Sequence, residues 1–164
     1  MLAYVLYFLA SLLLHEIGHV AAAYACRVTI REFGLGWGPK LFGFRIKQVD
    51  YTVRVLPLGA YVRLDMSELQ QRPLGQQVLI LLAGIIVNLL AATATNGTGF
   101  SVMNFLLAST NILPLYQQDG WKCGMVMLRC ILRRKSLLVE WTFTIAGSGL
   151  SLLLIAAEAF SQLR

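Results

Sequence analysis

The stretch from residue 1 to residue 26 is strongly apolar, yet it contains the closely spaced polar residues His15, Glu16 and His19. On a helix, residues four apart lie on one face, so His15 and His19 point the same way and can bind one metal ion through two imidazoles. Glu16 sits one step round, where it can act on water rather than serve as a ligand. Polar groups in an apolar membrane helix are costly unless they serve a site. The chain has no other histidine, so this pattern predicts a metal site.

The composition predicts an integral membrane protein in contact with a lipid bilayer. Hydrophobic residues make up 57% of the 164 residues, charged residues only 13%, and the mean hydropathy is +0.67. A soluble domain carries about a quarter charged residues. The net charge of +6 would suggest nucleic acid as a partner in a soluble protein. In a membrane protein it instead indicates basic loops that face anionic lipid, so we expect no nucleic-acid partner.

The expected fold is a single polytopic membrane domain over residues 1–164, mainly α. About four transmembrane helices are predicted, because a span needs about 20 apolar residues. Residues 28–64 alternate apolar and polar side chains between glycines and prolines, which predicts a small membrane-associated β-sheet with a hairpin near residues 48–50. Residues 65–75 are expected to be a polar linker, and residues 121–135 a short basic helix or loop. The four predicted spans are residues 1–26, 76–95, 100–116 and 137–161.

Basic residues predict the orientation in the membrane. Four spans place the loops 27–75 and 120–136 on one side, and these loops hold thirteen of the fourteen lysines and arginines. Positively charged loops stay in the cytoplasm. We therefore expect both loops in the cytoplasm and both termini outside it, in what fits a prokaryotic plasma membrane.

A catalytic zinc site usually has three protein ligands and an open position for water. His15 and His19 supply two, and the third must come from elsewhere in the chain. Among the three aspartates, Asp119 stands out because it follows a helix that Pro114 should break. A plain Asp-Gly turn at a helix end explains Asp119 equally well, so the residues by themselves leave both interpretations open.

Four further motifs accompany the H-E-x-x-H pattern of residues 15–19. They are a glycine-rich segment at residues 33–39, a P-L-G-A-Y-V strand end at residues 57–62, an A-G-x-x-x-N helix segment at residues 83–88, and an N-x-x-P-x-x-x-x-D-G element at residues 111–120. In order and spacing the chain resembles the site-2 protease family of intramembrane zinc metalloproteases. Ala60, Ile85 and Trp121 depart from the family pattern, but none occupies a ligand position. No segment resembles the PDZ or CBS domains of some members, so we expect a minimal core.

The resemblance implies an intramembrane zinc endopeptidase that cleaves transmembrane protein substrates within or near the membrane, as in regulated intramembrane proteolysis. It implies one Zn²⁺ per chain, with Asp119 as the third ligand beside His15 and His19. It also implies Glu16 as the general base and Asn111 as a residue that steadies the oxyanion. The substrate, the cleavage position and the oligomeric state do not follow from the sequence.

Two other functions compete with this one. A non-catalytic relative could bind membrane helices, but such a protein has no need of Glu16. A metal transporter could use the same ligands, but its spans would be expected to carry further acidic or histidine side chains. For the protease, an extended substrate segment could pair with the strand Tyr51–Leu56 by strand addition; a purely structural sheet is the alternative.

Overall fold

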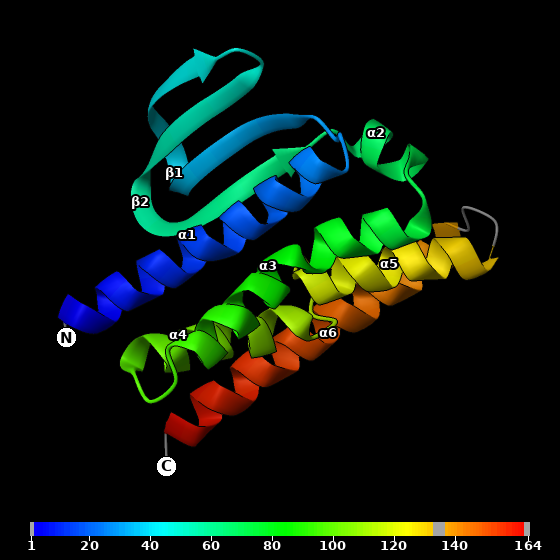
Figure 1. The fold of residues 1–164 in the computed structure, drawn as a ribbon. Coiled ribbons are helices and arrows are strands. Elements are labelled where there is room, and N and C mark those ends of the chain that lie inside the picture. Colours follow the sequence, from blue (N-terminus) through cyan, green and yellow to red (C-terminus); the bar gives the residue numbers. More distant parts are fainter. Residues whose placement is uncertain (1, 133–136, 163–164) are drawn as a thin grey trace. The chain divides into compact units, whose positions relative to one another are not determined.

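The computed structural model describes residues 2–132 and 137–162. The chain divides into two compact units, Met1–Ser109 and Thr110–Arg164, and each is described by itself. The expectation of a single domain stays a prediction. The elements, in order, are α1 (Leu2–Ala25), β1 (Ile30–Ile46), β2 (Val49–Leu64), α2 (Met66–Gln71), α3 (Leu74–Ala94), α4 (Gly99–Ile112), α5 (Asp119–Leu132) and α6 (Leu137–Gln162) (Figure 1).

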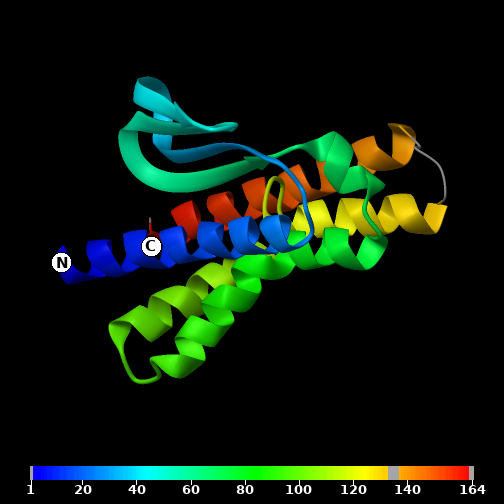
Figure 2. The same cartoon turned by 45° about the horizontal axis from the view of Figure 1, so that its top comes forward.

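Helix α1 is the centre of the first unit. The sheet lies on one side of α1, and α3 with α4 lies on the other, as Figures 1 and 2 both show. The backbones of α1 and α3 approach closely at Gly18, where an added Cβ would be 2.8 Å from the carbonyl oxygen of Ala83. Small residues at such crossings allow apolar helices to pack tightly.

Two helices in the described part of the chain are long and apolar enough to cross a membrane, namely α1 with 24 residues and α3 with 21. Both agree closely with predicted spans. The predicted third span, residues 100–116, is too long: α4 ends at Ile112, two residues before Pro114, because proline disfavours helical backbone in the residue before it. In the part of α6 whose side chains the structure describes, Leu137–Leu153 is apolar. The count of four spans therefore stays a prediction.

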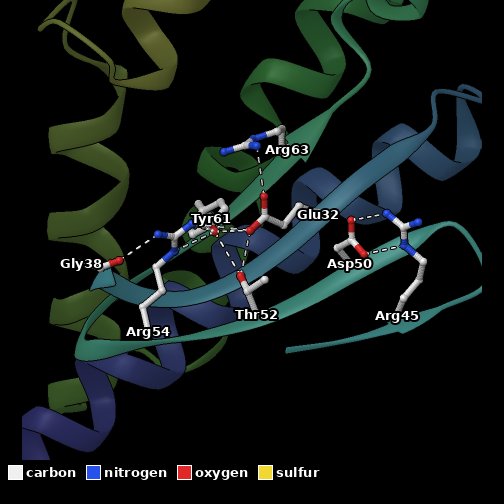
Figure 3. Close-up of polar contacts among 8 residues, drawn as sticks. All are labelled: Glu32, Gly38, Arg45, Asp50, Thr52, Arg54, Tyr61 and Arg63. Carbon is white, nitrogen blue, oxygen red and sulfur yellow. Dashed lines mark hydrogen bonds and ion pairs between the residues drawn. The ribbon is translucent and has the colours of Figure 1, made fainter. Parts of the chain in front are cut away.

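The β-rich segment contains two long strands that bend and pair repeatedly. The predicted hairpin is present, with its turn at Lys47 and Gln48. Beside this turn, Arg45 and Asp50 form an exposed ion pair of 2.6 Å between Nε and Oδ1 (Figure 3). The two strands leave the turn antiparallel, with Ile46 opposite Val49.

The register corrects the expectation that Tyr51–Leu56 offers a free edge. Thr52 pairs with Gly34 on one side and with Gly43 on the other, and Gly34 also pairs with Tyr61. Residues 50–53 of β2 therefore form an inner row of the sheet, with a paired row on each side. The outer rows are residues 42–46 and residues 60–64. An added strand would have to pair with one of these.

A polar cluster on the sheet is centred on Glu32 (Figure 3). Glu32 accepts hydrogen bonds from the hydroxyls of Thr52 and Tyr61, and Arg63 lies 3.2 Å and Arg54 3.7 Å from its carboxylate oxygens. Burial by itself would raise the pKa of Glu32, but the bonds from Tyr61 and Thr52 and the charges of the two arginines bring the pKa below its ordinary value. The cluster ties three rows of the sheet together.

The predicted linker contains a short helix instead, α2. Asp65 caps it by accepting hydrogen bonds from the backbone N–H groups of Ser67 at 2.9 Å and Glu68 at 3.2 Å. The sequence Asp65-Met66-Ser67-Glu68 carries this signal, because a capping residue followed three positions later by Glu is typical of a helix start. Glu68 also accepts a hydrogen bond of 2.7 Å from the backbone of Thr29, which anchors α2 beside the end of α1.

The second unit begins where α4 ends and contains α5 and α6. The chain turns back tightly here, since a Cβ on Gly120 would lie 2.1 Å from the carbonyl oxygen of Ile112. The segment predicted as a short basic helix or loop is a helix, α5. Arg129 of α5 and Glu140 of α6 form an ion pair of 2.8 Å.

Two glycines of β1 have backbone conformations whose free-energy cost can be measured by substitution with alanine. Gly36 and Gly38 have φ values of 89° and 87°, which side-chain-bearing residues rarely adopt. A Cβ on Gly36 would lie 2.5 Å from the carbonyl oxygen of Leu56, whereas a Cβ on Gly38 would meet nothing within 4 Å. We expect G38A to lower the free energy of unfolding by about 1–2 kcal/mol because of backbone strain. G36A should lower it clearly more, because its Cβ would also collide with Leu56. Unfolding in mixed detergent micelles checks this, and equal losses would contradict the close approach at Gly36.

Candidate metal centre

The two histidines of α1 face the same point, as the sequence predicts. The His15 and His19 side chains are 3% and 8% exposed, and their Nε2 atoms lie 3.2 Å apart. Zinc binds imidazole nitrogen at about 2.0–2.1 Å, so two nitrogens at tetrahedral positions are about 3.3–3.4 Å apart. The observed separation is close to this value. The pair is therefore spaced to share one tetrahedral ion.

The other nitrogen of each ring is held by α3. Nδ1 of His19 lies 2.7 Å from the carbonyl oxygen of Ile80, and Nδ1 of His15 lies 2.6 Å from Oδ1 of Asn88. A carbonyl oxygen only accepts, so each neutral ring carries its proton on Nδ1 and keeps the lone pair on Nε2. A ligand histidine generally uses its second nitrogen in this way, which fixes the orientation of the ring.

Gly84 of α3 keeps the space beside the imidazoles open. A Cβ built on Gly84 would lie 2.6 Å from Nε2 of His19 and 2.7 Å from Nε2 of His15. Any side chain here would therefore collide with both imidazole rings and push their Nε2 atoms out of place. The spacing, the protonation pattern and this cradle together fit a zinc ion.

Glu16 is half-buried, next to His15 along α1 but one step round from the face that the histidines share. Its role as the general base stays a prediction.

Three buried residues extend the site beyond the predicted set. Asn88 belongs to the A-G-x-x-x-N segment, but its contact with His15 was not foreseen, and Ser11 and Asn104 were missed altogether. All three are fully buried. One signal could have found them: a polar residue inside an apolar membrane helix is a candidate functional residue by itself.

The second unit contains Asn111 and Asp119. Asn111 is half-buried in the last turn of α4, and Asp119 is buried at the first residue of α5, where Nζ of Lys122 approaches its Oδ1 to 2.9 Å. The tight turn at Gly120 brings the end of α4 beside the start of α5. The roles of Asp119 as a third ligand and of Asn111 toward the oxyanion stay predictions.

Comparisons with known proteins agree with this site. The model of peptidase family M50 matches residues 3–101, which include α1, the sheet and α3. A Clostridium perfringens protein described as a candidate zinc metalloprotease is 33% identical over 93 residues, which are 52% of this chain and 28% of that protein. The regulator of sigma-W protease RasP from Bacillus subtilis is 38% identical over 63 residues, which are 38% of this chain and 15% of RasP.

The matched segments thus make up about a quarter or less of the relatives' own lengths. The family match, with the two long apolar helices, indicates an integral membrane protein. More than half of the residues fit the family model, and this chain belongs to peptidase family M50, the family of the site-2 proteases.

Proposed function

We propose that this chain forms the catalytic core of an intramembrane zinc endopeptidase that cleaves transmembrane protein substrates within or near the membrane. One observation carries the proposal: Nε2 of His15 and Nε2 of His19 converge at 3.2 Å beside the bare backbone of Gly84. Relatives named as zinc metalloproteases support the choice of metal and reaction.

His15, His19 and Asp119 would hold one Zn²⁺. The two histidines are preorganised by α3, and Asp119 is the carboxylate that the D-G motif supplies. When bound, zinc provides Lewis acidity, which makes water a stronger acid and polarises a peptide carbonyl.

The protein's own groups move the protons and steady the charge. Glu16 takes a proton from the attacking water and later delivers it to the amine that leaves when the peptide bond breaks. The side-chain amide of Asn111 donates a hydrogen bond to the carbonyl oxygen as that oxygen gains negative charge. Glu16 needs only its carboxylate for this role, and Asn111 needs only its side-chain amide, each beside the reacting bond.

We also propose the four-span arrangement, with loops 27–75 and 120–136 in the cytoplasm. A helical substrate hides its peptide groups in hydrogen bonds, so the segment to be cut must become extended and find new partners. The outer rows of the sheet, residues 42–46 and 60–64, are the rows able to pair with it by strand addition.

The base assignment is tested by E16Q. We expect zinc content to stay at one ion per chain and the cleavage rate of a transmembrane model substrate to fall by about 10²–10⁴, because the proton acceptor is lost. Metal analysis and cleavage assays on the same detergent-purified sample check both. Retained cleavage would remove Glu16 from the mechanism.

The third ligand is tested by D119A. Loss of one of three ligands should weaken zinc affinity strongly, as measured by competition with a chromogenic chelator. D50A is the matched control, since Asp50 is an exposed aspartate paired with Arg45. If D119A binds zinc as tightly as D50A does, another group completes the site.

The role of Gly84 is tested by G84A. The new methyl group would collide with both ligand nitrogens and push them apart, so we expect zinc affinity to drop at least tenfold, although alanine by itself favours helical backbone. G75A is the control on the same helix, because a Cβ there meets nothing within 4 Å. Equal zinc affinity in the two variants would rule out the cradle.

A further inference from the structure

A chain of buried hydrogen bonds runs from α4 through α3 to His15. Nδ2 of Asn104 lies 2.9 Å from the carbonyl oxygen of Phe100 and 2.9 Å from Oγ of Ser11. Oδ1 of Asn104 accepts a 2.7 Å bond from Nδ2 of Asn88. Oδ1 of Asn88 in turn faces Nδ1 of His15 at 2.6 Å.

The direction of this chain is fixed at its far end. The Phe100 carbonyl can only accept, so Asn104 must turn its NH₂ group toward Phe100 and its oxygen toward Asn88. Asn88 must then turn its NH₂ group toward Asn104 and its oxygen toward His15. The carbonyl oxygen of Ser11, 3.1 Å from Nδ2 of Asn88, requires the same orientation. Both amide donors of each asparagine are thus used.

The orientation of Asn88 decides which nitrogen of His15 carries the proton and which can bind a metal ion. An oxygen opposite Nδ1 requires a proton on Nδ1, which leaves the lone pair on Nε2, the atom that faces His19 and Gly84. A reversed Asn88 would present N–H groups to Nδ1 and favour the proton on Nε2, where it would block a metal ion. Because Asn88 and His15 are buried between helices, such a mismatch is costly.

We propose that Asn104, acting through Asn88, is a positioning residue that sets the metal-binding tautomer of His15. Neither asparagine touches the metal position or substrate in this role. Ser11 supports the arrangement from α1 itself, one helical turn before His15. The inference rests on the proposed zinc site for its purpose, but the tautomer is a property of the protein without metal.

The test uses the full chain labelled with ¹⁵N-histidine, in detergent, without metal and at about pH 8, above the ordinary pKa of a free imidazole. The chain has two histidines, so their ring nitrogens can be assigned by comparison with H19A. In the wild type we expect His15 protonated on Nδ1. In N104L, Asn88 loses one acceptor, so we expect a substantial fraction of His15 protonated on Nε2.

Three variants make the result specific. N104D, with its buried carboxyl group protonated, keeps an acceptor oxygen for Asn88 and a donor for the Phe100 carbonyl, and it should keep the wild-type tautomer. N104A removes the amide without adding bulk, and it repeats the N104L prediction should leucine prevent folding. S101A removes another hydroxyl that joins α4 to α3, through its 2.7 Å bond to the carbonyl of Ala92, and should leave the tautomer unchanged.

Cobalt binding gives the second readout. Loss of a hydrogen bond that orients a ligand typically weakens metal affinity by 10- to 100-fold. We expect N104L or N104A to weaken Co²⁺ binding about tenfold and to alter its visible absorption, and N104D and S101A to do neither. A folded N104L or N104A with the wild-type tautomer would overturn the inference. If the tautomer changes in N104L or N104A but the wild type binds no metal, the positioning role of Asn104 stands and the proposed zinc site is contradicted.

Discussion

Polar side chains within apolar helices must find hydrogen-bond partners inside the protein, because neither lipid nor apolar side chains supply any. In the first unit this requirement joins α1 to α3. His15 bonds to Asn88, and His19 bonds to the backbone carbonyl of Ile80. The bonds that make buried histidines tolerable also decide which nitrogen of each ring keeps its lone pair. Helix packing and metal binding therefore depend on the same contacts.

Two glycines, which have no side chain, matter as much as these hydrogen bonds. Gly18 lets the two helix backbones approach, and Gly84 leaves the space that the two imidazole rings occupy. Glycine inside a helix costs about 1 kcal/mol relative to alanine. Glycine is needed at both positions despite this cost. A Cβ on Gly18 would separate the helices, and a Cβ on Gly84 would collide with the imidazole rings.

The sheet shows where reasoning from sequence stops. Alternation of apolar and polar residues correctly located β-structure and the hairpin, because side chains alternate between the two faces of a strand. It could not say which strands are neighbours, so strand addition at Tyr51–Leu56 and a purely structural sheet both stayed open, and only the structure shows that Thr52 pairs on both sides. The missed helix α2 is a different case, since the Asp65-to-Glu68 pattern was present in the sequence.

The sequence by itself determined the H-E-x-x-H pair, the two long apolar helices that carry most of the site, and the family motifs, because helical spacing and hydropathy are local properties of the chain. Only the tertiary structure decided what holds the pair in place. The partners of His15 and His19 lie 73 and 61 residues away, at Asn88 and Ile80. Asn88 also donates hydrogen bonds to Ser11 of α1 and Asn104 of α4, so the contacts extend across three helices. Such contacts depend on how the helices cross, and no local periodicity encodes a crossing.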